Sequence, residues 1–210
     1  MVRQSVASHL ILAAVLLACS VCASASAFKS FDFPGATETV LNDINNKNTA
    51  VGYYLDQLGI AHGFVATESG HLTSVDFPDS TATYAYGIND SDQIVGWYVD
   101  SLGTEHGYVC HSGQFTTIDP PNSTDTRAWD ISNGNPVIVG TYFDPAYGQY
   151  RGFSYQSGGY GGYDPPGATH TEICLGAQHV ENFVGIHETG VLFIEGEHGF
   201  NRDDVNEISG

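Results

Sequence analysis

The sequence predicts an all-β fold: a β-propeller of about four four-stranded antiparallel blades, preceded by a signal peptide. Three observations lead to this prediction. Four columns of residues recur at a period of about 44 residues. Each period contains four short segments rich in β-branched and aromatic residues, separated by turn residues. After residue 27, no useful window shows the 3.6-residue apolar period of a helix. One four-stranded sheet per roughly 40–45 residues is the spacing of a propeller blade.

Four residue columns carry the repeat and can be compared within the one chain. An aspartate in the motifs FDFP, VDFP, IDPP and YDPP lies at Asp32, Asp76, Asp119 and Asp164. A glycine that follows valine lies at Gly52, Gly96, Gly140 and Gly185. A His-Gly-aromatic triplet occupies 62–64 and 106–108 and becomes Arg-Gly-Phe at 151–153. A turn aspartate lies at Asp56, Asp100 and Asp144. Four columns at one period predict a repeated structural unit.

The second period shows the predicted strands most clearly. They are TYAYGIN (83–89), QIVGWYV (93–99), EHGYVCH (105–111) and QFTTIDP (114–120). Asp, Asn, Ser and Gly clusters at 89–92, 100–103 and 112–113 separate them and favour tight turns. Short strands joined by tight turns predict a four-stranded meander. Packing on both faces of each blade accounts for continuous apolar runs such as 94–98.

The chain divides into a secretory signal peptide, 1–27, and a single propeller domain, 28–210. Arg3, the apolar run 10–18 and the small residues 25–27 follow the pattern of a signal peptide. That run is shorter than the roughly 20 residues needed to span a bilayer, so no transmembrane segment is expected. Residues 16–19 (LLAC) also resemble a lipobox, which would make Cys19 a lipid anchor. Either pattern places the protein outside the bacterial cytoplasm: secreted, periplasmic or at the cell surface.

Ring closure has two alternatives. The blades are expected at about 37–78, 81–121, 125–166 and 170–205, with 28–34 as a ring-closing strand. The chain then holds five outer-strand equivalents for four sheets. The alternative is an open or five-bladed arrangement, completed by a second molecule.

The charge of the chain disfavours some partners. Six Lys and Arg face 24 Asp and Glu, for a net charge of −18. Nucleic acid is not expected as a partner, because binding to phosphates needs clustered basic residues. An anionic membrane surface is disfavoured for the same reason. Cations, neutral glycans and basic proteins remain as candidate partners, and an acidic chain also gains solubility.

The pattern GIND-x-x-x-IVG-[YW]-Y…HGF…TxxDxP resembles the bacterial extracellular repeats called the HAF family, after a His-Ala-Phe triplet. The triplet here is His-Gly-aromatic, and the resemblance covers residues 28–193. It implies an exported, repeat-built protein and carries over no catalytic residue.

The repeated polar residues are expected to be structural. The turn aspartates suit Asx turns, with glycine taking positive φ. His62 and His106 are interpreted as hydrogen-bond donors, because Arg151 replaces them in the third repeat and arginine has no lone pair for a metal.

The fourth repeat breaks the pattern and gains histidines and glutamates. His179, His187 and Glu188 are the candidate metal ligands, for a divalent cation such as Ca²⁺ or Zn²⁺. The alternative is a decaying terminal repeat with a solvated polar face. The predicted fold requires no cofactor.

Aromatic residues are the other candidates. Trp97, Trp129, Tyr86 and Tyr160 are predicted to bind a ligand, since aromatic rings stack on sugar faces. The alternative for these residues is packing between blades.

Three functions remain open. The first is a non-catalytic module that binds an extracellular glycan or surface protein. The second is a polysaccharide lyase or hydrolase with a His/carboxylate site in the fourth blade. The third is a purely structural surface repeat. The chain contains no nucleophile elbow, P-loop or dinucleotide-binding motif.

Overall fold

The computed structural model describes residues 30–163, 171–175, 182–187 and 190–195, with side chains for 30–162. The chain forms two compact units, Met1–Ser30 and Phe31–Gly210, and all the described strands belong to the second. Among the described residues, no helix is long and apolar enough to cross a membrane.

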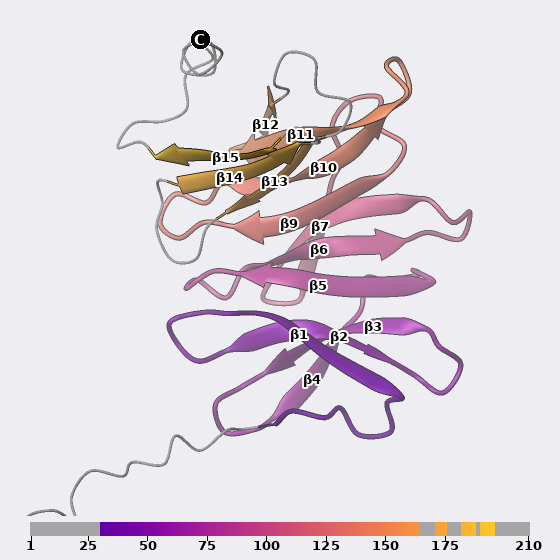
Figure 1. Cartoon of the computed structure of the whole chain (residues 1–210). Helices are drawn as coiled ribbons and strands as arrows, with labels where there is room; N and C mark the ends of the chain where they lie inside the picture. The colour runs from indigo at the N-terminus through magenta and orange to yellow at the C-terminus, as the bar shows by residue number, and fades with distance from the viewer. Residues whose placement is uncertain (1–29, 164–170, 176–181, 188–189, 196–210) are drawn as a thin grey trace, which may run out of the picture. The chain divides into compact units, whose positions relative to one another are not determined.

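The described part of the chain is all-β and built from antiparallel meanders (Figure 1). Sheet 1 holds β1 (Glu38–Ile44), β2 (Ala50–Leu55), β3 (Ala61–Ala66) and β4 (Leu72–Val75). Sheet 2 holds β5 (Ala82–Ile88), β6 (Ile94–Val99), β7 (Glu105–His111) and β8 (Gln114–Ile118). Sheet 3 holds β9 (Thr126–Ile131), β10 (Ile138–Asp144), β11 (Gln149–Gln156) and β12 (Gly159–Tyr163). A further sheet holds β13 (Thr171–Leu175), β14 (Asn182–His187) and β15 (Gly190–Glu195). The prediction of an all-β chain of antiparallel sheets is confirmed.

Neighbouring sheets pack through the first strand of each. β5 lies against β1, β2 and β3, and β9 lies against β5, β6 and β7. β13 contacts β9, β10 and β11 in the same way. Among the described strands the sheets do not close into a ring, so a propeller is not established. The outer strand predicted for the fourth blade, near residues 200–205, lies outside the described residues.

Apolar clusters fill the spaces between the sheets. Sheets 1 and 2 bury Val51, Ala85, Ile88, Ile94, Tyr108 and Cys110. Sheets 2 and 3 bury Val95, Ile118, Ala128, Ile131, Ile138 and Phe153. The apolar runs of the second strands therefore face two neighbours, as their composition predicts.

The repeated Val-Gly glycines lie opposite a β-bulge. In sheets 1 to 3 the register of the first strand skips one residue beside the glycine: Asn42, Tyr86 or Trp129. A Cβ on Gly96 would collide with the carbonyl oxygen of Tyr84, and the other two sheets repeat this close approach. Bulges re-aim side chains, so these glycines set the direction of the first-strand residues at the bulge.

The Asp-x-Pro segments connect consecutive sheets. Asp76 reaches back to His62 in sheet 1, with 3.1 Å between carboxylate and imidazole. The next residue, Phe77, stacks on Tyr98 of sheet 2 at 3.6 Å between ring centroids. Phe33 stacks on Tyr54 of sheet 1 in the same way, at 3.8 Å. The connector between sheets 1 and 2 therefore ties one sheet to the next.

This stacking also accounts for the segment before β1. Residues 30–34, the described part of the ring-closing strand predicted at 28–34, belong to no strand. Phe31 and Phe33 instead pack on the sheet 1 cluster of Ala50, Phe64 and Ala66.

Candidate functional site

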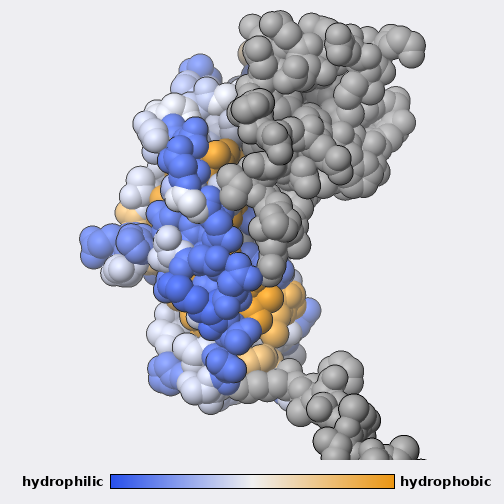
Figure 2. All heavy atoms as spheres, turned by 90° about the vertical axis from the view of Figure 1, so that its left-hand side faces the viewer, coloured by the Kyte–Doolittle hydropathy of each residue, from blue (hydrophilic) through white to orange (hydrophobic). Residues whose placement is uncertain are grey.

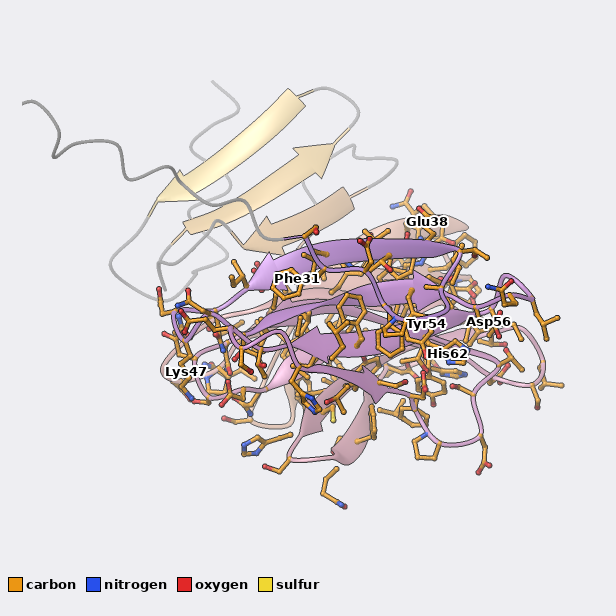
Figure 3. All side chains as sticks on the ribbon, turned by 90° about the horizontal axis from the view of Figure 1, so that it is seen from below. Phe31, Glu38, Lys47, Tyr54, Asp56 and His62 are labelled. Carbon is orange, nitrogen blue, oxygen red and sulfur yellow. The ribbon has the colours of Figure 1, made fainter. Side chains whose placement is uncertain are left out.

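The triplet histidines lie between two aspartates of their own sheet. Nδ1 of His106 is 2.7 Å from Asp119 and Nε2 is 3.5 Å from Asp100. His62 lies between Asp76 and Asp56 in the same way, at 3.1 and 3.6 Å. Figure 3 shows Tyr54, Asp56 and His62 gathered at one end of sheet 1, with Lys47 at the opposite end. Both imidazoles thus lie against carboxylate oxygens, which is compatible with their interpretation as hydrogen-bond donors.

The turn aspartates hold their own backbone. Oδ1 of Asp100 accepts the backbone N–H groups of Leu102 and Thr104, at 2.8 and 2.9 Å. Asp56 does the same for residues 58 and 60. In the third repeat, Arg151 Nη1 donates to Asp144 Oδ2 at 3.0 Å, where the other repeats use histidine. Within the described residues, no group of three or more His, Cys, Asp and Glu side chains is arranged to hold a metal ion.

Three of the four aromatic residues predicted to bind a ligand meet in one cluster. The ring centroid of Tyr86 lies 4.6 Å from that of Trp97 and 5.0 Å from that of Trp129. Trp97 and Trp129 are 5.0 Å apart, edge to face. Tyr84 stacks on Trp97 at 4.9 Å. These four residues, here called the aromatic cluster, join β5, β6 and β9 of sheets 2 and 3.

The members of the aromatic cluster differ in exposure. Trp97 is buried, with 6% of its surface exposed, whereas Tyr84, Tyr86 and Trp129 are half-buried. Nε1 of Trp129 donates to Oγ1 of Thr141 at 3.0 Å, which fixes the indole. Trp97 is thus the packed base of the cluster, and the bulge residues Tyr86 and Trp129 are more accessible.

An ion pair lies beside the aromatic cluster. Nε and Nη2 of Arg127 both donate to the carboxylate of Glu105, with Nη2 at 2.8 Å. The guanidinium carbon lies 5.3 Å from the centroid of the Trp97 ring. The hydrogen bonds to Glu105 raise the pKa of Arg127. The sequence analysis missed this pair, because no motif links a third-strand glutamate to a first-strand arginine of the next repeat.

Asp43, Gly87 and Asp130 take the same position in their first strands, directly after the bulge residue. The carboxylates of Asp43 and Asp130 lie near Gly87 of β5. A Cβ on Gly87 would lie 2.9 Å from Cα of Asp130, and Oδ2 of Asp43 accepts the N–H of Ile88 at 2.8 Å. Burial raises the pKa of Asp130 to about 7, against the effect of the Ile131 N–H, and the charge of Asp43 raises it further. Burial also raises the pKa of Asp43.

Tyr160, the fourth predicted aromatic residue, lies apart from the aromatic cluster. It sits in β12, where its ring centroid is 4.9 Å from that of Tyr155 and 6.2 Å from that of Phe153. Burial raises the pKa of Tyr160, and the backbone of Asp119 partly offsets this effect. Tyr160 therefore contacts rings of its own sheet while 37% of its surface stays exposed.

The predicted metal ligands are not tested. His179 and Glu188 lie outside the described residues. His187 is the last residue of β14, where only the backbone is described.

A pocket between sheets 1 and 2 was not predicted. It measures about 470 Å³. Val65, Val75, Ile88, Ile94, Cys110 and Phe115 form its apolar part. Its polar part comprises Thr49, Thr73, Ser74, Asp76, Ser91, Asp92, His111, Ser112 and the backbone at Gly113. It uses no member of the aromatic cluster.

Comparison with known proteins assigns no relative. No protein-family model matches the chain, and no curated protein is detectably similar to it. The resemblance to the HAF-repeat family therefore stands as a proposal.

Proposed function

We propose that this protein is an exported, non-catalytic β-propeller of the HAF-repeat type that binds an extracellular glycan. The observation that carries the proposal is the meeting of Tyr86 and Trp129, from two sheets, over the buried ring of Trp97. Both are bulge residues of first strands, and bulges commonly re-aim side chains at binding sites.

The surroundings of the aromatic cluster favour a sugar over other ligands. Sugars present flat C–H faces to rings and hydroxyls to charged groups, and both kinds of partner are found here. The Arg127–Glu105 pair supplies donors and acceptors beside the rings. The net charge of −18 favours a neutral glycan over an anionic one.

Apolar exposure extends to the first strand of sheet 1. Leu41 and Ile44 of β1 are 44% and 54% exposed, and β1 lies against β5. The side view in Figure 2 shows hydrophobic atoms at the surface among hydrophilic ones. An extended glycan chain could contact β1 as well as the aromatic cluster.

The test is retention of the protein on a panel of immobilised neutral and anionic polysaccharides. Retention of the unaltered protein on at least one neutral polysaccharide is expected. Trp129→Ala and Tyr86→Ala should each weaken retention about tenfold or more, since a stacked aromatic contact contributes on the order of 1–2 kcal/mol. Tyr147→Ala is the matched control, because Tyr147 is an exposed tyrosine on the β10–β11 turn.

Three outcomes would contradict the proposal. Retention on no polysaccharide would favour a structural repeat. Equal retention of Trp129→Ala, Tyr86→Ala and the control Tyr147→Ala would show that the aromatic cluster is not the binding site. Depolymerisation of a retained polysaccharide would identify an enzyme. Thermal melting and a Trp129→Phe variant, which keeps a ring, separate lost binding from lost folding.

A further inference from the structure

The pocket between sheets 1 and 2 lies where one cross-strand pair of side chains differs between the repeats. The strand register places Ala66, Cys110 and Tyr155 at the same position of their third strands. Their partners on the fourth strands are Leu72, Phe115 and Tyr160. In sheet 3 this cross-strand pair is therefore two tyrosines, and in sheet 2 it is Cys110 with Phe115.

Tyr155 of sheet 3 occupies the position that Cys110 takes one repeat earlier, whereas its partner Tyr160 is exposed. Tyr155 packs against the apolar cluster between sheets 2 and 3. Tyr160 contacts Tyr155 across the two strands. Cys110 faces sheet 1 from the corresponding position, and its small side chain leaves the pocket unfilled. Close-packed interiors leave few such gaps, so a hollow of this size between two sheets is unusual.

The lining of the pocket combines an apolar floor with hydroxyl groups. Valines 65 and 75, isoleucines 88 and 94, and the half-buried ring of Phe115 provide the floor. Thr49, Thr73, Ser91 and Ser112 bring hydroxyls, and no side-chain hydrogen bond within the described residues occupies them. A volume of about 470 Å³ lies within the range of small-molecule sites.

The charges at the pocket select against an anion. Asp76 and Asp92 line it, whereas none of the lysines and arginines that the structure describes does. Asp76 is already bonded to His62 and Ser74, and Asp92 to Lys47 and Asn45. The polar side-chain groups left for a ligand are hydroxyls and the imidazole of His111, which donate as well as accept and suit an uncharged partner.

We propose that this pocket is a second binding site, for an uncharged, polyhydroxylated ligand of sugar size that lays an apolar face on Phe115. This site does not rest on the proposed function of the aromatic cluster, since the two share no residue. It differs from an unused void in having both a stacking surface and unoccupied hydroxyls.

The test maps ligand contacts by amide chemical shifts of the ¹⁵N-labelled protein. The probes are methyl glycosides of glucose, galactose and mannose, and N-acetylglucosamine, with glucuronate as the charged comparison. At least one neutral probe should shift the amides of Ser112, Gly113 and Phe115. Glucuronate at equal concentration should shift them at least fivefold less.

Variants of the pocket decide the assignment. Cys110→Tyr, which copies the third repeat, should abolish the shifts, and Cys110→Ala should retain them. Thr73→Tyr closes the pocket from the opposite wall and serves if Cys110→Tyr fails to fold. Trp129→Ala should leave the shifts intact, which separates this site from the aromatic cluster. The proposal would be overturned if no neutral probe shifted these amides. It would also be overturned if Cys110→Tyr and Thr73→Tyr both showed the same shifts as the unaltered protein.

Discussion

Nδ1 of His106 lies 2.7 Å from Oδ2 of Asp119, at the point where the fourth strand of sheet 2 ends and the connector begins. The opposite ring nitrogen faces Asp100, the residue that shapes the preceding turn. The imidazole thus ties a turn to a connector. Its position in a repeated structural contact explains why the same column accepts Arg151 in the third repeat.

Stability should depend on the charge of His106. Burial alone lowers the pKa of His106, but the hydrogen bonds and charges of Asp119 and Asp100 more than offset this and raise it. A raised histidine pKa contributes stability that is fully present below about pH 6.5, and this stability is lost as pH rises through the folded-state pKa. His106→Gln should therefore lower the melting temperature more at pH 5.5 than at pH 8.5.

The control for this measurement is His71→Gln. His71 is exposed, and its substitution should change the melting temperature little at either pH. An equal loss for His106→Gln at both pH values would show that the imidazole acts without its charge.

Asp130 should also make stability fall with rising pH, but over a different pH window, because burial favours the neutral form of this carboxyl. Its folded-state pKa of about 7 exceeds the unfolded value near 4, so the folded protein binds more protons between these values. Stability therefore falls as pH rises from about 4 to 7. Asp130→Asn should raise the free energy of unfolding at pH 8, on the order of 1 kcal/mol, and change it little at pH 4.

Urea unfolding at both pH values measures this effect of Asp130. Asp79→Asn is the matched control, because Asp79 is exposed and the third repeat has Asn122 in the corresponding turn, also at positive φ. Destabilisation by Asp130→Asn at pH 8 would contradict the prediction.

Gly96 should tolerate no side chain. An added Cβ would collide with the carbonyl oxygen of Tyr84 at the bulge, and backbone cannot move aside as a flexible side chain can. Gly96→Ala should cost about 3 kcal/mol or more in urea unfolding. Gly162→Ala, which meets open space, should change stability by less than about 0.5 kcal/mol. Similar unfolding midpoints for the two variants would show that the close approach of Gly96 to the Tyr84 carbonyl does not explain the glycine.

Phe77 should contribute stability as a link between sheets. Its ring stacks on Tyr98 and contacts Tyr108 and Phe115 of sheet 2. Phe77→Ala should lower the free energy of unfolding by about 3 kcal/mol, in the range for large-to-small changes of packed aromatics. Leu102→Ala is the control, since Leu102 is 88% exposed. A loss below about 1 kcal/mol for Phe77→Ala would mean that the connector does not hold the sheets together.

The sequence predicted those features that are local or repeated. The strands of the second period follow from β-branched residues and turn clusters, and the roles of Asp100 and His106 followed from comparison with Arg151. Tyr86 and Trp129 were recognisable as one column. Their contact with Trp97 depends on how two sheets pack, which no single repeat encodes.

Other features needed the packed structure. Tyr160 was grouped with the ligand-binding aromatics, but its register opposite Tyr155 places it in sheet 3, apart from the aromatic cluster. The change in side-chain size at Ala66, Cys110 and Tyr155 is visible in the sequence. It indicates a pocket only once the structure shows that this position faces the preceding sheet. Segment 28–34 was predicted as a strand from its likeness to later repeats, whereas Phe33 stacks on Tyr54.

The connectors also define where this protein could be cut and rejoined. The two contacts of a connector point in opposite directions, with Asp76 serving the sheet behind it and Phe77 the sheet ahead. A self-sufficient module therefore runs from Phe33 to Asp76, or from Phe77 to Asp119, and not from one sheet edge to the next. An engineered array spliced between Asp76 and Phe77 would give every histidine its carboxylate and every second-strand tyrosine its stacking partner. A splice at the start of β5 would instead leave Phe77 with the preceding module and so remove the stacking partner of Tyr98.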